Sequence, residues 1–215
     1  MRAFISYSHI DKGTAAWVKS QLISLGIDVF LAHEDIEPSS EWQEEILRQL
    51  RICEIFLPIL TPDFDSSSWT DQETGFAVCR EIPIIPLSAG EIPHGFINKY
   101  QACPLNLKDS PGFRARMVEI LSKNSTTRKE FLNLLIGVFG NSDSFDEAGV
   151  NMGWLLKCKK YLTGKQRNRI VELAASNPQI HDSFSARRNL RVLLDEFGDK
   201  LKPSLVKDLE EKMSK

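Results

Sequence analysis

Trp69 and Glu73 are the residues whose types and spacing best suit a chemical step. In a helix, residues four positions apart lie on one face, so the indole and the carboxylate would be neighbours. The ring can stack on a heteroaromatic leaving group, while the carboxylate stabilises positive charge developing at the anomeric carbon of a sugar. The pair therefore fits cleavage of a glycosidic bond. The same spacing also fits a glutamate that complements the helix dipole and a tryptophan that packs, so spacing alone does not establish an enzyme.

Other common catalytic patterns are absent from the sequence. It contains no G-x-G-x-x-G, no G-x-x-x-x-G-K-[ST] and no G-x-S-x-G. The histidines are too scattered for a zinc hydrolase, and the cysteines form no C-x-x-C pair, so we expect each cysteine to be a small buried apolar residue. These residues are His9, His33, His94, His181, Cys53, Cys79, Cys103 and Cys158.

The composition is that of an ordinary globular protein. Of 215 residues, 42% are hydrophobic and 26% are charged, which argues against global disorder. The apolar runs are far too short to span a bilayer, and the N-terminus lacks the features of a secretory signal. We therefore expect a cytoplasmic location and no membrane partner.

The charge is distributed unevenly along the chain. Residues 1–120 carry 10 Lys and Arg against 17 Asp and Glu, whereas residues 121–215 carry 17 against 12. So abrupt a change suggests two units with different surfaces. We place the boundary near residues 122–127 and predict one domain over 1–122 and a second over 123–215.

The first half alternates between strand and helix patterns, which indicates an α/β fold. Continuous apolar runs bounded by helices predict a parallel sheet covered on both faces, and a flavodoxin-like five-stranded sheet is the natural topology. The predicted strands are 2–6, 27–31, 54–60, 83–87 and about 102–105, and the predicted helices are 12–25, about 40–50, 69–80 and 112–121.

Three polar loops follow the carboxyl ends of these strands, where open α/β sheets bind their ligands. They cover residues 6–9, 32–40 and 63–69, and they are rich in hydroxyls, carboxylates and aromatic rings. A helix starting near Ser40, which Gln43 would complete as a capping box, could offer free N–H groups to phosphates. A binding site, if the chain has one, is expected at this edge.

Several motifs, taken in order, resemble the Toll/interleukin receptor (TIR) domain in its bacterial form, over roughly the first 120 residues. Phe4–Ser8 with Asp11 resembles the first box of the family. The other matching segments are Gly26–Leu31 with His33–Pro38, which resembles the second strand and the following "BB" loop, Ser68–Glu73, which resembles the catalytic helix of enzymatic members, and Ile82–Leu87, which resembles the fourth strand.

The resemblance implies one of two functions. Enzymatic members cleave NAD⁺ to nicotinamide and ADP-ribose or a cyclic ADP-ribose, whereas others are non-catalytic interaction modules that assemble with further TIR domains. In the enzymatic reading, NAD⁺ is the substrate and no metal or further cofactor is needed. Glu73 is then the catalytic carboxylate, and the substrate-binding residues are Trp42 and Trp69, which line the pocket, and Phe4, Ser6 and Tyr7, which form its floor.

Some positions depart from the family pattern. Ser8 and His9 stand where some members carry basic residues, and Ala32 stands where an acid is frequent. The loop over Ile36–Ser40 lacks the Pro-Gly of receptor-type members, which favours the enzymatic reading over the adaptor reading.

The second half shows helical patterns only and predicts a small all-α bundle of five helices. Thr127 with Glu130, and Thr163 with Gln166, predict capping boxes. We expect this domain to contact another protein, to sense a trigger or to set the oligomeric state, with self-association through the TIR domains. Nucleic acid is a poor candidate, because aromatic residues are not interleaved with the basic ones. The basic residues are Lys157, Lys159, Lys160, Lys165, Arg167, Arg169, Arg187, Arg188 and Arg191.

Overall fold

The computed structural model describes residues 1–31, 42–64 and 66–214. It divides the chain into two compact units, Met1–Met117 (the N-terminal unit) and Val118–Lys215 (the helical unit). The division falls inside the helix α4 (Ser110–Lys123), the same helix that holds the predicted boundary between residues 122 and 123.

The N-terminal unit is built on a five-stranded parallel sheet in the order β2-β1-β3-β4-β5, which confirms the predicted flavodoxin-like topology. In the central strands, Ala3 pairs with Val29 on one side and with Ile55 on the other. The strands are β1 (Arg2–Ser6), β2 (Asp28–Leu31), β3 (Ile55–Leu60), β4 (Leu87–Ser88) and β5 (Cys103–Pro104).

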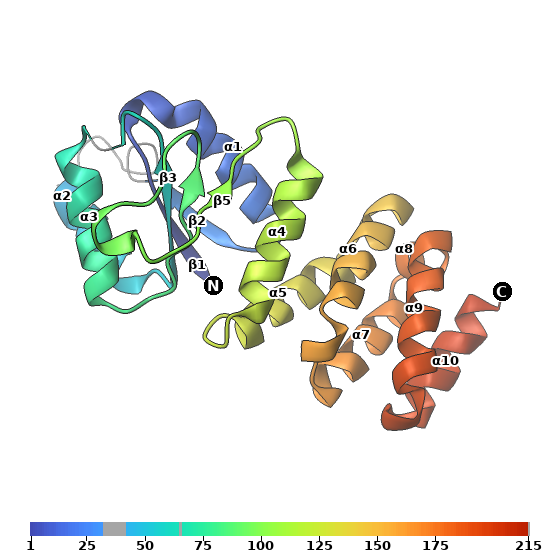
Figure 1. Cartoon of the computed structure of the whole chain (residues 1–215). Coiled ribbons are helices and arrows are strands. Elements are labelled where there is room, and N and C mark those ends of the chain that lie inside the picture. The colour runs from blue at the N-terminus through green and yellow to red at the C-terminus, as the bar shows by residue number, and fades with distance from the viewer. Residues whose placement is uncertain (32–41, 65, 215) are drawn as a thin grey trace. The chain divides into compact units, whose positions relative to one another are not determined.

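Helices cover both faces of this sheet. Figure 1 shows α2 and α3 on one side, with α1 and α4 on the other. The rings of Trp17 in α1 and Phe113 in α4 meet with centroids 5.1 Å apart, which places these two helices on a common face. Besides α4, the helices of this unit are α1 (Lys12–Ile23), α2 (Trp42–Ile52) and α3 (Ser68–Cys79), with short 3-10 turns η1 (His9–Asp11) and η2 (Gly95–Ile97).

An aromatic core fills the face that α2 and α3 cover. Phe4 lies between Phe30 and Phe56, with ring centroids at 5.4 and 5.8 Å. Ile46 of α2 and Ala77 of α3 belong to the same buried cluster. Every residue of β3 is buried, as expected for the continuous apolar run of a central parallel strand.

The fourth strand is shorter than the predicted range 83–87. Pro83 and Pro86 have no N–H group, so they cannot donate to a neighbouring strand. Their carbonyl groups still accept, from the N–H groups of Phe56 at 3.0 Å and Cys103 at 2.7 Å, and Ile85 N–H bonds Phe56. The segment therefore forms one isolated bridge, between Ile84 and Phe56, and regular pairing begins only at Leu87.

The helical unit contains helices only, within the part of it that the structure describes. Asn177 and Pro178 start one more short helix instead of simply interrupting the chain, because the Asn177 side chain caps it and Pro178 fits its first turn. The helices are α5 (Arg128–Gly140), α6 (Phe145–Lys157), α7 (Gly164–Ser176), α8 (Pro178–His181), α9 (Phe184–Phe197) and α10 (Pro203–Met213), with η3 (Lys159–Tyr161) and η4 (Gly198–Lys200).

Only one of the predicted capping boxes is confirmed. At the start of α7, Thr163 and Gln166 bond each other reciprocally. At the start of α5 the prediction is wrong, because Thr127 has helical backbone angles and donates its hydroxyl to the Leu121 carbonyl at 2.8 Å. The box at Ser40 lies outside the described residues. Across residues 1–31, 42–64 and 66–214, no helix is long and apolar enough to cross a bilayer.

Candidate functional site

Glu73 is a buried carboxyl group that one turn of α3 presents to the end of β1. Its side chain is 3% exposed, and Ser6 Oγ donates to Glu73 Oε2 at 2.5 Å. Two residues along a strand span about 6.6 Å, and four residues along a helix span about 6 Å. Every second residue of β1 can therefore face every fourth residue of α3. Phe4, two residues before Ser6, and Ala77, one helix turn after Glu73, both belong to the buried core cluster. Core packing therefore fixes the contact between Ser6 and Glu73.

Burial makes Glu73 a weaker acid than an exposed glutamate. Desolvation raises its pKa from 4.5 to about 7, and the hydrogen bond from Ser6 partly opposes that rise. Among the described residues, no cationic side chain forms an ion pair with it. At neutral pH the group is therefore divided between its protonated and ionised forms, which suits a carboxyl group that must respond to a charge arriving nearby.

The indoles of Trp42 and Trp69 contact each other at the amino ends of α2 and α3. Trp42 begins α2, and Trp69 lies in the first turn of α3, one turn before Glu73. Their ring centroids are 4.4 Å apart at an interplanar angle of 63°, an edge-to-face contact. Trp42 is 40% exposed and Trp69 is partly buried, so both indoles keep some open surface. An aromatic pair thus lies at the same sheet edge as Glu73.

The remaining predicted site residues occupy different positions. Phe4 is fully buried beneath Ser6 as part of the aromatic core, and Tyr7 is 1% exposed directly after β1. The predicted loop over 32–40, including the N–H groups near Ser40, lies outside the described residues. The structure therefore brings Ser6, Glu73, Trp42 and Trp69 to one edge and keeps Phe4 in the core.

Two sets of contacts that sequence reasoning did not identify support the site, one at this edge and one at the opposite ends of α2 and α3. Thr61, directly after β3, donates to Asp11 Oδ2 at 2.6 Å and so ties two of the loops at the carboxyl edge. Arg80, directly after α3, donates to the Leu50 and Cys53 carbonyls at 2.5 and 2.8 Å. These carbonyls terminate α2, where a cation complements the helix dipole. Arg80 thus joins the carboxyl ends of the two helices whose amino ends carry the indoles.

Three of the four cysteines are buried, and the described residues hold no metal-binding cluster. Cys53, Cys103 and Cys158 are buried as expected, and burial raises the pKa of the Cys53 thiol to about 11. Cys79 is exposed, which corrects the expectation for that residue. No group of three or more His, Cys, Asp or Glu side chains among the described residues is arranged to hold a metal ion.

The basic residues of the helical unit are largely engaged within it. Lys159 pairs with Glu196, and Arg169 pairs with Glu172. Aromatic rings do lie among these charges, contrary to the prediction that they are not interleaved. Each ring is covered by a cation of the protein itself: Trp154 by Lys157, Tyr161 by Lys160 and Phe197 by Arg167. The rings are therefore engaged in cation–π contacts within the unit.

Comparison with known proteins identifies the family. Residues 3–126 match the family model described as the TIR domain, which is more than half of the chain, so the protein belongs to the TIR domain family. Among solved structures, the chain is similar to the TIR domain of the Toll-related receptor TRR-2 from Hydra magnipapillata. The identity is 18%, the match covers 57% of this chain and 98% of that chain, and the TM-score is 0.47. No curated protein matches the chain.

Proposed function

We propose that this protein is an NAD⁺ glycohydrolase, which cleaves the nicotinamide–ribose bond and releases nicotinamide with ADP-ribose or a cyclic ADP-ribose. The observation that carries the proposal is the buried carboxyl group of Glu73, bonded to Ser6 and one helix turn from Trp69. A module that only binds other proteins has no need for a buried acid with a raised pKa beside two indoles. Membership of the TIR domain family admits both kinds of protein, so the proposal rests on the site residues.

The reaction follows from the charge of the substrate. As the bond between the pyridinium nitrogen and the ribose C1′ breaks, its electron pair goes to the nitrogen, nicotinamide leaves neutral, and positive charge moves to the ribose ring. Ionised Glu73 stabilises that charge, and burial strengthens the interaction because little water screens it. Water then adds to C1′ and loses a proton to give ADP-ribose, or a nucleophilic atom of the same molecule closes a ring. NAD⁺ is the substrate, and the proposal requires no metal or further cofactor.

The neighbouring residues have distinct proposed roles. The indoles of Trp42 and Trp69 face the nicotinamide ring, and Ser6 holds the carboxyl group of Glu73 in place. Tyr7 forms part of the floor of the substrate pocket, and Phe4 packs beneath that floor in the core. Self-association of TIR domains activates the enzyme, which acts on cytoplasmic NAD⁺ in defence or signalling.

A product assay tests the proposal. Concentrated protein is incubated with NAD⁺ and nicotinamide is followed by chromatography, for the wild type, Glu73→Gln and the matched control Glu45→Gln. Glu45 lies on α2 and bonds Arg48, so its loss should leave the rate unchanged. Loss of Glu73 should reduce the rate roughly a hundredfold or more. Equal release from Glu73→Gln would refute the assigned role. No release at any protein concentration would favour the non-catalytic interaction module.

A further inference from the structure

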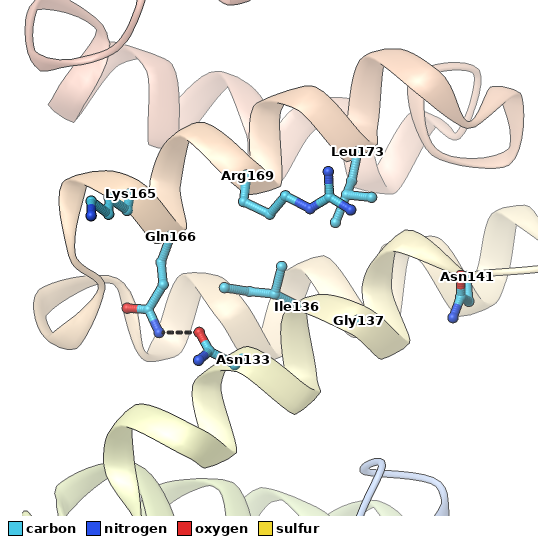
Figure 2. Close-up of a pocket in the computed structure, with 8 residues that line it drawn as sticks. All are labelled: Asn133, Ile136, Gly137, Asn141, Lys165, Gln166, Arg169 and Leu173. Carbon is cyan, nitrogen blue, oxygen red and sulfur yellow. Dashed lines mark hydrogen bonds between the residues drawn. The ribbon is translucent and has the colours of Figure 1, made fainter.

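A groove lies between α5 and α7 in the helical unit, entirely outside the N-terminal unit. Its volume is about 470 Å³, within the size range of small-molecule sites. Figure 2 shows the residues that line it, which belong to α5, to its C-cap Asn141 and to α7. Nothing in the proposed reaction at Glu73 uses this groove.

Contacts at two points set the spacing of the helices around the groove. On one side, Gln166 Nε2 donates to Asn133 Oδ1 at 2.8 Å, the dashed line in Figure 2. Further along, Leu173 lies directly over Gly140, where an added Cβ would come within 2.8 Å of it. Between these points lies Gly137, whose missing side chain leaves the floor open, because an added Cβ there would meet no atom within 4 Å.

Gly137 is not explained by the needs of the fold. Glycine inside a helix is less stable than alanine, and this residue is neither in the positive-φ region nor blocked by a neighbour. Gly140 in the same helix differs, since Leu173 leaves it no room for a side chain. A bare backbone position is useful where a ligand must approach the chain closely. The open floor at Gly137 therefore suits a bound molecule.

The rim of the groove favours an anion. Lys165 and Arg169 lie one turn apart on the same face of α7, and both are exposed. Lys165 forms no ion pair among the described residues. Arg169 bonds Glu172 through one nitrogen, which leaves other guanidinium N–H groups able to donate. Two cations at this spacing match the oxygens of a phosphate.

We propose that this groove binds a small phosphorylated molecule, with its phosphate at Lys165 and Arg169 and its uncharged part over Ile136, Gly137 and Leu173. The lining contains no aromatic ring, so recognition of the uncharged part rests on shape and on the amides beside it, such as Asn133. This site is independent of NAD⁺ cleavage and would remain if Glu73 proved to have no catalytic role.

The test is a titration of the full chain followed by backbone amide resonances, with ADP, ribose 5-phosphate and inorganic pyrophosphate as separate probes. Adenosine, which lacks phosphate, is the ligand control. Amide resonances locate binding, because ADP can also enter the N-terminal unit. At least one phosphorylated probe should shift resonances of α5 and α7, and comparison of ADP with ribose 5-phosphate shows whether a nucleotide or a sugar phosphate fits.

Matched variants make the assignment specific. Gly137→Leu should fill the groove and weaken binding roughly tenfold or more, whereas Gly137→Ala should retain most of it. The double variant Lys165→Gln with Arg169→Gln should weaken binding at least as much, and Arg188→Gln, an exposed change on α9, should not. The surface variants leave the fold intact, so the charge comparison stands even if Gly137→Leu folds poorly.

Four results would overturn the proposal: no probe binding at millimolar concentration, shifts confined to the N-terminal unit, affinity unchanged by the double variant, or adenosine binding as tightly as ADP.

Discussion

Replacing Glu73 with glutamine should stabilise the protein by an amount that depends on pH. The glutamine has nearly the same shape and can still accept from Ser6, but it carries no ionisable group. The wild-type carboxyl group is 3% exposed, and burial raises its pKa from 4.5 to about 7. The variant therefore removes the cost of holding a charge in the interior and keeps the packing.

The sign and size follow from the two pKa values. Below pH 4.5 the carboxyl group is protonated in both the folded and the unfolded state, so the two proteins differ little. As pH rises the unfolded state loses its proton first, and the wild type loses stability until the folded group also ionises near pH 7. The pKa difference corresponds to a decrease of roughly 3 kcal/mol in the free energy of unfolding of the wild type between acid and high pH. Glu73→Gln should gain about that much above neutral pH and almost nothing in acid.

Urea unfolding across this pH range measures the effect. Tryptophan fluorescence reports mainly on the N-terminal unit, because Trp17, Trp42 and Trp69 lie in it. Glu45→Gln is the control, since the bond from Arg48 lowers the pKa of Glu45 to about 2 and its loss should give no gain at high pH. A difference between wild type and Glu73→Gln that stays constant with pH would show that Glu73 is not a desolvated acid.

Four further outcomes are expected. The kcat/KM for NAD⁺ should rise with pH through a midpoint near pH 7 and level off roughly one unit above it, because only ionised Glu73 stabilises the ribose cation. Ser6→Ala should move the midpoint of this pH dependence to higher pH by roughly one unit, because the lost hydrogen bond favoured the ionised form of Glu73. Arg80→Met should lower the free energy of unfolding in urea by about 1–3 kcal/mol, because carbonyls at the end of α2 lose their donor. Gly137→Ala should raise thermal stability by about 0.5–1 kcal/mol, and Gly140→Ala should lower it through the clash with the facing helix.

The sheet was predictable because each strand is a local signal. Continuous apolar runs such as Ile55–Leu60 and a glycine at the end of the first helix, Gly26, identify elements without knowledge of their partners. Their order then follows from the right-handed crossover rule. Pro83 and Pro86 show where this reasoning ends, because the run is apolar enough for a strand but lacks the donors for one.

Local motifs failed where the preceding chain competes for the same group. Thr163 and Thr127 begin similar sequences, each followed three residues later by Gln or Glu. Thr163 follows an extended approach and forms its capping box. Thr127 follows the turn after α4, and its hydroxyl donates a hydrogen bond to the carbonyl of Leu121 in the last turn of α4. The path of the chain before the motif determines whether the hydroxyl bonds the helix N–H group or an upstream carbonyl group. The spacing between Thr and Gln or Glu does not predict that path.

The site was only half visible for a related reason. Spacing placed Trp69 beside Glu73, but Ser6 is 67 residues away in sequence and meets Glu73 only because α3 packs antiparallel to β1. The burial that raises the pKa of Glu73 is likewise a property of the packed fold. Arg80 has no local signal either, since its acceptors belong to another helix.

The burial that suits Glu73 to chemistry also destabilises the folded protein when the carboxyl group ionises. The surrounding contacts hold the group in place despite that cost. A shallower carboxyl group would be cheaper to ionise but would be screened by water and less able to stabilise a cation. A buried carboxyl group must be held by rigid surroundings. The aromatic core beneath Ser6, the indole contact between Trp42 and Trp69, and the bonds of Arg80 at the opposite helix ends supply that support. Because α2 and α3 are joined at both ends, a change at Arg80 should reach the indoles without touching Glu73 itself.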